Sequence, residues 1–136
     1  MPASAGARAF LLAAVLAAAG CEELPPVPNV PPAASFVYSP VSPINAGQTG
    51  VTFNASGSRD ADGQVVGYTW NFGDGTAEES RENAVITHVF PDTPARCIDV
   101  VYTVLLTVRD NVGDHGSASQ AARVTELPVP GSNECR

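Results

Sequence analysis

Two short acidic turns contain the residue types that could do chemistry in this chain. The first is DADG at positions 60–63, in which Asp60 and Asp62 lie two residues apart. Both carboxylates of such a pair can turn toward one hard cation, and Ca²⁺ takes roughly six to eight oxygen ligands. Two carboxylates do not complete a site, and the spacing is not that of an EF-hand. The same sequence also forms ion-free turns in which each Asp accepts local N–H groups, so both interpretations stay open.

The second turn is FGDG at positions 72–75, directly after the aromatic stretch YTWN. A phosphate-binding P-loop would need a Lys and a following helix, but the chain contains no Lys and continues as TAEES. Gly73 and Gly75 suit the positive φ angles of a sharp reversal, and the Asp74 carboxylate can accept backbone N–H groups. We therefore predict that FGDG is a structural corner.

Short strands are the elements that must position these turns. From residue 33 onward, apolar and polar residues alternate between clusters of Gly, Pro, Asn and Asp, which is typical of half-buried strands. The two central patterns are VVGYTWNF at 65–72, with Tyr68, Trp70 and Phe72 on one face, and VVYTVLLTV at 100–108. Further strands are expected at 34–38, 51–55, 78–81, 85–90 and 118–127. About seven short strands without helical periodicity predict an all-β fold, an Ig-like antiparallel β-sandwich.

Side chains for catalysis are few. A hydrolytic triad needs a nucleophile within hydrogen-bond reach of a histidine, and the histidines are His88 and His115. His88 falls beside Phe90 on an expected inward face, which indicates a core residue, and His115 lies in an expected hairpin turn. Carboxylate pairs that cleave sugars need a concave site, which a small filled sandwich rarely offers. The inward position of Trp70 indicates a core residue rather than a platform for sugars. The sequence therefore predicts a non-catalytic protein.

The N-terminus predicts secretion and lipid attachment. Residues 1–20 contain a positive charge at Arg8, an apolar run and small residues before Cys21, which indicates a signal peptide too short for a good membrane span. The ending AAGC resembles a bacterial lipobox, after which the cysteine carries the lipid. An ordinary signal that leaves Cys21 as a plain thiol is the alternative. Lipidation would place the protein in the bacterial cell envelope, with the outer membrane as the expected location.

Proline marks the segment between this signal and the strands. Residues 22–32 read EELPPVPNVPP, a composition that forbids helix and favours an extended polyproline arm. Lipidated Cys21 and this arm form the expected linker at 21–32, and a disordered terminus without a spacing role is the alternative. We expect the β-sandwich at 33–127 and a tail at 128–136. A chain of 136 residues leaves room for one domain of about 100 residues.

The cysteine count indicates one disulfide. The chain has 3 cysteines, and lipidation of Cys21 would leave Cys97 and Cys135 as an even pair in an oxidising compartment. Cys97 precedes the 100–108 strand and Cys135 follows the 118–127 strand, so pairing these strands as a hairpin would bring both cysteines to one end. We predict a Cys97–Cys135 disulfide, which the chain-entropy model would credit with about 4 kcal/mol of stabilisation.

Charge excludes one class of partner. The 14 acidic residues against 7 basic ones give a net charge of −7, which repels nucleic acids and anionic lipid head groups. We expect no nucleic-acid partner. The acidity fits an exposed protein or one that binds cations.

Residues 51–113 resemble the PKD domain, an Ig-like module named for polycystin. The resemblance rests on VTFNASGSRDADGQVVGYTWNFGDGT, on THVF at 87–90 and on YTVLLTVRDNVG at 102–113. The FGDG turn after a Tyr-x-Trp strand is its most specific mark. The resemblance implies an extracellular interaction or spacer module without catalytic activity. It also implies a calcium site in which Asp110 joins Asp60 and Asp62, and Asn29 could supply one more oxygen.

These observations lead to one expected function and one alternative. We expect a membrane-anchored extracytoplasmic binding or structural module that contacts a protein or glycan partner at the cell surface. The alternative is an accessory or assembly subunit of a larger cell-envelope complex, or of a separately encoded secreted hydrolase. Calcium is the one cofactor that the sequence indicates.

Overall fold

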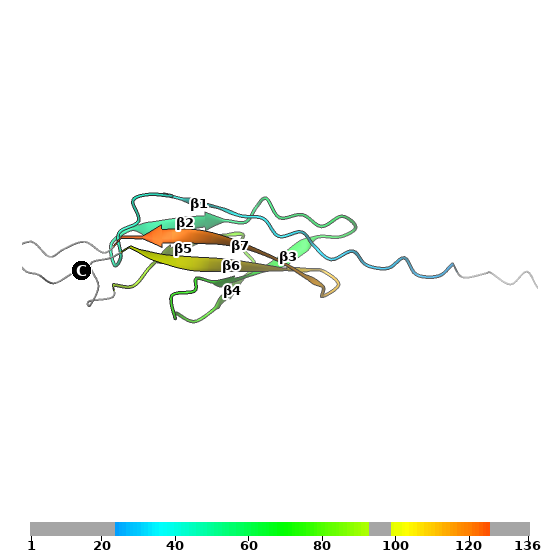
Figure 1. The fold of residues 1–136 in the computed structure, drawn as a ribbon. Coiled ribbons are helices and arrows are strands. Elements are labelled where there is room, and N and C mark those ends of the chain that lie inside the picture. The colour runs from blue at the N-terminus through cyan, green and yellow to red at the C-terminus, as the bar shows by residue number, and fades with distance from the viewer. Residues whose placement is uncertain (1–23, 93–98, 126–136) are drawn as a thin grey trace, which may run out of the picture.

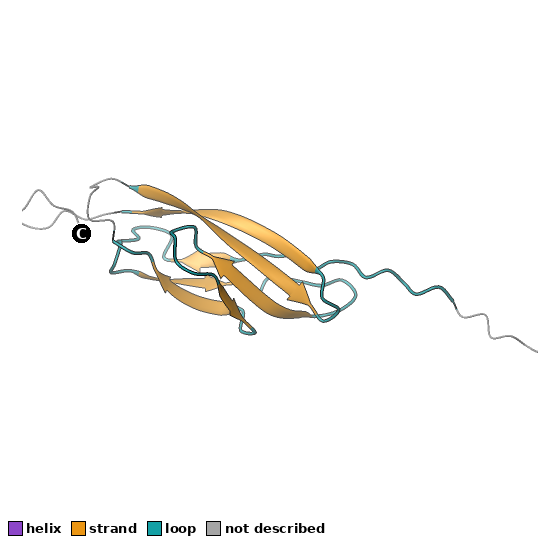
Figure 2. Ribbon diagram, turned by 90° about the horizontal axis from the view of Figure 1, so that it is seen from below, coloured by secondary structure: helices purple, strands orange, loops and turns teal. Residues whose placement is uncertain are grey.

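The computed structural model describes residues 24–92 and 99–125, which form two antiparallel sheets packed face to face (Figures 1 and 2). The predicted all-β sandwich is confirmed. The strands are β1 (Val37–Ser39), β2 (Gly50–Asn54), β3 (Val65–Asn71), β4 (Glu79–Arg81), β5 (Val85–Val89), β6 (Val100–Asp110) and β7 (His115–Val124). One sheet has the order β1-β2-β5 and the other β4-β3-β6-β7. Nothing in the described ranges has the helical length and apolarity that crossing a membrane requires.

The first and last strands differ from the predicted ranges. β1 begins at Val37 rather than residue 34, because the preceding residues bond to the loop after β2, where Ala33 N–H donates to the Arg59 carbonyl at 2.7 Å. β7 begins at His115 rather than residue 118. The hairpin turn spans only 111–114, because β6 continues to Asp110 and pairs with β7 along their whole lengths.

A cluster of aromatic rings fills the space between the sheets. Phe53 of β2 lies 5.7 Å from Trp70 of β3 and 5.2 Å from Phe72, measured between ring centroids. Trp70 is fully buried, as its place in the strand pattern predicted. Because strand side chains alternate in direction, the inward residues of β6 complete this layer. The buried apolar residues are Phe36, Ile44, Ala46, Val51, Phe53, Ala55, Trp70, Phe72, Ile86, Phe90, Val104, Leu106, Val108, Ala122 and Val124.

Residues 29–36 form a strap along the outer edge of β7, and we call this segment the N-terminal strap. The Gln120 side-chain amide donates to the carbonyl of Phe36. Next to the strap, the Tyr38 hydroxyl donates to the carbonyl of Ala121 at 2.8 Å. The chain enters the strap at the end of the sandwich where β6 turns into β7, and β7 ends at the opposite end (Figure 1). The strap therefore covers an edge that would otherwise be open.

Gly116 is the position at which strap and sheet come closest. A Cβ added there would lie 1.8 Å from the carbonyl oxygen of Pro32, which is far inside van der Waals contact. Gly116→Ala is therefore expected to displace the strap and to lower the free energy of unfolding by about 1–3 kcal/mol, measured by urea denaturation. Gly57→Ala is the control, because its Cβ would meet the Ser35 hydroxyl at an ordinary 3.5 Å. Equal losses in both variants would contradict the close approach.

Candidate functional site

The DADG loop and the β6–β7 turn lie at one end of the sandwich, and the strap joins them. The Asn29 side-chain amide donates to Asp110 Oδ2 and to Asp114 Oδ2, both at 2.8 Å. The backbone N–H of Val30 donates to Asp62 Oδ2 at 3.0 Å. The structure thus brings Asn29, Asp62 and Asp110 together, although Asn29 presents its NH₂ group to the carboxylates and not the oxygen that the sequence analysis assigned to it.

Asp60 belongs to the same end. A Cβ added to Gly63 would lie 2.7 Å from Asp60 Oδ2 and 2.5 Å from Asn111 Oδ1, so the two oxygens flank one position. Asn111 in turn accepts the backbone N–H of Gln64 at 2.8 Å. A side chain at this position would have to displace one of these oxygens, which favours the glycine in DADG.

Asp110 is held as a carboxylate by several donors. The hydrogen bond from Asn29 lowers the pKa of Asp110 below its ordinary value. Burial acts in the opposite direction, and the backbone N–H groups of Val112, Gly113 and Asp114, which donate to Oδ1 at 2.9, 2.6 and 2.8 Å, lower the pKa further. The charged form is therefore the one that stabilises the β6–β7 turn.

This lowered pKa predicts a loss of stability in acid. A carboxyl whose folded pKa lies below its unfolded value of about 3.9 contributes fully above that value, and the contribution disappears as the pH falls through the folded pKa. The melting temperature is expected to fall as the pH drops from about 5 through the folded pKa of Asp110. Asp110→Asn should be less stable at neutral pH and should flatten this fall. Asp99→Asn, which changes an exposed carboxylate paired with Arg123, should keep it. If the melting temperature of Asp110→Asn fell with pH as steeply as that of the wild type, the acid loss would not come from Asp110.

The residues at this end fit calcium by type. Asp60 Oδ2 is buried and has no hydrogen-bond partner among the described residues, and such an oxygen is one that a cation would satisfy. The other side chains offer carboxylate and amide oxygens, which are the ligands of hard cations. In the described part of the chain, however, no three His, Cys, Asp or Glu side chains lie close enough together to hold a metal ion. The carboxylates of Asp62 and Asp110 instead accept hydrogen bonds from donors of the strap.

The FGDG turn is a closed corner against the sheet. Gly73 and Gly75 have φ angles of 72° and 87°. Asp74 Oδ1 accepts the N–H of Thr76 at 3.0 Å and its hydroxyl at 2.6 Å. Asp74 Oδ2 lies 2.6 Å from His88 Nε2, and the His88 ring stacks on Phe72 with 3.7 Å between centroids. The turn is thereby fastened to β5 of the other sheet.

The pair of Asp74 and His88 was not visible in the sequence. Both positions were assigned structural roles, but nothing in a spacing of 14 residues shows that they touch. Burial of the Asp74 side chain works to raise its pKa, but the hydrogen bonds from Thr76 and the contact with His88 outweigh it and lower the pKa below the ordinary value. The Asp74 side chain is fully buried. The pair therefore holds the turn against β5 and is not accessible to a substrate.

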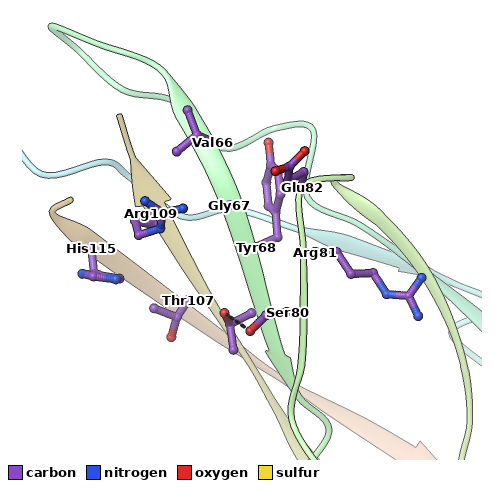
Figure 3. Close-up of a pocket in the computed structure, with 10 residues that line it drawn as sticks. Val66, Gly67, Tyr68, Ser80, Arg81, Glu82, Thr107, Arg109 and His115 are labelled. Atoms are coloured by element: carbon purple, nitrogen blue, oxygen red, sulfur yellow. Dashed lines mark hydrogen bonds between the residues drawn. The ribbon is translucent and has the colours of Figure 1, made fainter. Parts of the chain in front are cut away.

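The outer face of the four-stranded sheet carries a second candidate site. A shallow depression of about 340 Å³ lies there, lined by residues of β3, β4, β6 and β7 (Figure 3). A row of hydroxyl groups crosses all four strands here, because Ser80, Thr69, Thr107 and Ser117 are register neighbours; we call it the hydroxyl row. Its first three members line the depression. Thr69 and Ser80 are hydrogen bonded at 2.9 Å, and Thr107 and Ser117 at 3.1 Å.

A second row lies beside the hydroxyl row. In it Gly67 pairs with Arg109, and Arg109 pairs with His115. Figure 3 shows the Arg109 and His115 side chains next to each other beside β3. Sequence reasoning did not single out these residues, because an outward Thr, Ser or Arg in a strand pattern looks the same whether it meets water or a ligand.

Comparisons with known proteins identify the family. The PKD domain model matches residues 29–125. The chain belongs to the PKD domain family. The resemblance inferred from the sequence is thus confirmed. The crystal structure of the PKD1 domain of Vibrio anguillarum Epp is similar to this PKD domain with a TM-score of 0.53 and 26% identity, over 72% of this chain and 98% of that one.

Two further relatives extend the comparison of this PKD domain. A structure described as carbohydrate-binding modules from the β-sandwich superfamily matches with a TM-score of 0.65 and 34% identity, over 78% of this chain and 39% of that one. Collagenase ColA of Clostridium perfringens is 39% identical over 85 residues, which cover 62% of this chain. The matched part is 7% of the length of that collagenase, so the similarity concerns one module of a much larger protein.

Proposed function

We propose that this PKD domain is a non-catalytic binding module that a lipid on Cys21 holds in the bacterial cell envelope, where it contacts a glycan or protein. The observation that carries the proposal is the outer face of the four-stranded sheet, with its depression, its hydroxyl row and an exposed arginine. The similarity to modules described as carbohydrate-binding supports it. The similarity to part of a collagenase supports a role beside hydrolysis of extracellular material.

The sheet face can be tested by blocking it. In the mature chain, Thr107→Glu would place a carboxylate in the middle of the hydroxyl row. Thr87→Glu is the matched control, because Thr87 forms the same kind of hydroxyl pair with Thr52, at 3.3 Å, on the other sheet. Binding to an array of glycans and extracellular-matrix proteins should disappear in Thr107→Glu and persist in Thr87→Glu. The reverse pattern would move the binding site to the three-stranded sheet.

Metabolic labelling and cell fractionation test the predicted lipid anchor. Cys21 lies outside the described residues, as do Cys97 and Cys135, and the anchor and the disulfide therefore stay predictions from the sequence. Cells given labelled palmitate should label the wild-type chain and not Cys21→Ser, and the wild-type chain should fractionate with the outer membrane. A labelled Cys21→Ser protein, or an unlabelled wild type, would remove the anchor from the proposal.

Calcium is proposed as a structural ligand of the strap end. Bound Ca²⁺ would neutralise the carboxylates of this end, with Asp60, Asp62 and Asp110 as the residues to hold it and Asn29 beside them. The buried, unpartnered Asp60 Oδ2 supports this proposal. Calcium would replace the strap N–H groups that bond Asp62 and Asp110 in the structure.

The calcium site can be tested by removing metal from the protein and then adding calcium. Added to the stripped protein, calcium should bind saturably in calorimetry and raise the melting temperature by several degrees, since a ligand that binds only the folded state stabilises it. Asp60→Asn should abolish both effects, and Asp99→Asn at the other end of the sandwich should retain them. If the wild type shows no heat of binding and no shift in melting temperature, DADG is an ion-free turn.

An assembly role is the second candidate. Val37, Val85 and Val89 have exposed fractions of 67%, 39% and 45%, and they lie on the outer face of the three-stranded sheet according to its register. Apolar side chains gathered on one face favour a protein partner. Photo-crosslinking from position 89 in cells, with position 119 on the opposite face as control, should trap a partner only from position 89 if the chain is an assembly subunit.

A further inference from the structure

The outer face of the four-stranded sheet lacks the aromatic platform on which neutral sugars stack. In the part of the chain that the structure describes, its outward positions are polar or small, apart from Val66, Val101 and Leu105. Tyr68 lines the depression, but its ring packs against the core. Recognition on this face must therefore use hydrogen bonds and charge.

Arg109 is the charged side chain on this face that is placed to bind a ligand. Its Nε and Nη2 atoms lie 3.6 and 3.7 Å from the place that a Cβ of Gly67 would occupy, so the guanidinium lies in the space that this glycine leaves open. The ion pairs of the described residues join Arg81 to Glu79, His88 to Asp74 and Arg123 to Asp99. None of them includes Arg109, which is exposed.

The surroundings of Arg109 select a particular partner. A guanidinium forms paired hydrogen bonds with a carboxylate, and the hydroxyl row next to it can both donate and accept, as sugar hydroxyls do. The molecule as a whole has a net charge of −7, so it does not attract polyanions over a long range. Binding of an anion here must rest on local contacts.

We infer that this face binds an acidic polysaccharide, with Arg109 holding the carboxylate of a uronic acid unit and the hydroxyl row bonding the hydroxyls of the neighbouring units. The inference rests on the proposed function and names its ligand class. An acidic peptide fits less well, because its side chains offer no hydroxyl groups to the hydroxyl row. The depression, which also contains Glu82, has Arg109, His115 and Arg81 as its basic side chains. Of these, Arg81 is already paired with Glu79 at 2.6 Å.

The experiment compares one sugar backbone in two charge states. The mature chain is titrated calorimetrically with tetragalacturonate and with the same oligosaccharide after reduction of its carboxyl groups. Tetragalacturonate should bind at least tenfold more tightly than the reduced form. Arg109→Gln should weaken its binding at least tenfold and leave the melting temperature unchanged, since the side chain is exposed. Arg123→Gln, on the same face but paired with Asp99 at 3.3 Å, should bind as the wild type does.

Each other outcome overturns the inference in a recognisable way. Equal binding of both oligosaccharides, unaffected by Arg109→Gln but lost in Thr107→Glu, would leave a neutral-glycan module and the proposed function intact. Tight binding of a tetra-aspartate peptide that competes with the uronide would replace the glycan by an acidic protein. Absence of binding to every probe, with no effect of Thr107→Glu on any ligand of the array, would overturn both this inference and the proposed function.

Discussion

Replacing Phe53 by alanine is expected to lower the free energy of unfolding by about 3–5 kcal/mol. Phe53 is fully buried and lies at the centre of the aromatic cluster. Its ring centroid is between 5.2 and 6.4 Å from those of five other rings, which belong to Phe36, Tyr38, Trp70, Phe72 and Phe90. Small domains have only about 5–15 kcal/mol of net stability. The variant should therefore be close to unfolding at physiological temperature.

Urea denaturation followed by tryptophan fluorescence would measure this loss, because Trp70 is the Trp of the chain and neighbours Phe53. Phe53→Leu is the control. It keeps most of the apolar volume and should cost about 1–1.5 kcal/mol. A similar small cost for Phe53→Ala would show that the two sheets close over the gap, and that the aromatic cluster does not set the spacing between them.

Gly73→Ala is expected to cost roughly 3–4 kcal/mol, from two independent causes. The residue has a φ of 72°, which L side chains adopt at a cost of about 1–2 kcal/mol. In addition, its Cβ would lie 2.5 Å from the backbone carbonyl oxygen of Thr103 in β6. A backbone atom of a central strand has little room to move, so the corner itself must shift and disturb the contact between Asp74 and His88.

Gly75→Ala separates the two causes. Gly75 has a similar φ of 87°, but a Cβ there would meet nothing within 4 Å. Only the conformational cost of about 1–2 kcal/mol remains. Thermal and chemical denaturation of both variants should rank Gly73→Ala as clearly worse. Equal losses would mean that the close approach to Thr103 is relieved without cost.

The regular part of the fold was predictable because it depends on local pattern. Alternation in VVGYTWNF and VVYTVLLTV places Trp70, Phe72 and Leu106 inside without knowledge of any partner strand, and the structure buries all three. The resemblance to PKD domains rests on a local motif as well. These signals are sufficient for the sandwich and for its two long central strands.

What escaped prediction depends on which strands become neighbours. The hydroxyl row exists only because β3, β4, β6 and β7 align four separate residues. The contact of Asp74 with His88 similarly needs the two sheets to be stacked. The role of Asn29 as a donor also depends on such neighbours, whereas the sequence analysis expected it to offer an oxygen. Its amide donates to Asp110, a choice that follows from the surplus of acceptors at that end.

The N-terminal strap has a consequence for the behaviour of the protein in solution. β7 is an edge strand of ten residues, and long uncovered edges recruit strands of other molecules and lead to aggregation. The strap and the Asn45–Thr125 bridge lie against this edge. The other edge strands are shorter, with 3 residues in β1 and in β4 and 5 in β5. A cut by a protease between residues 36 and 37 would thus free the strap and leave the β7 edge open to pairing with another molecule.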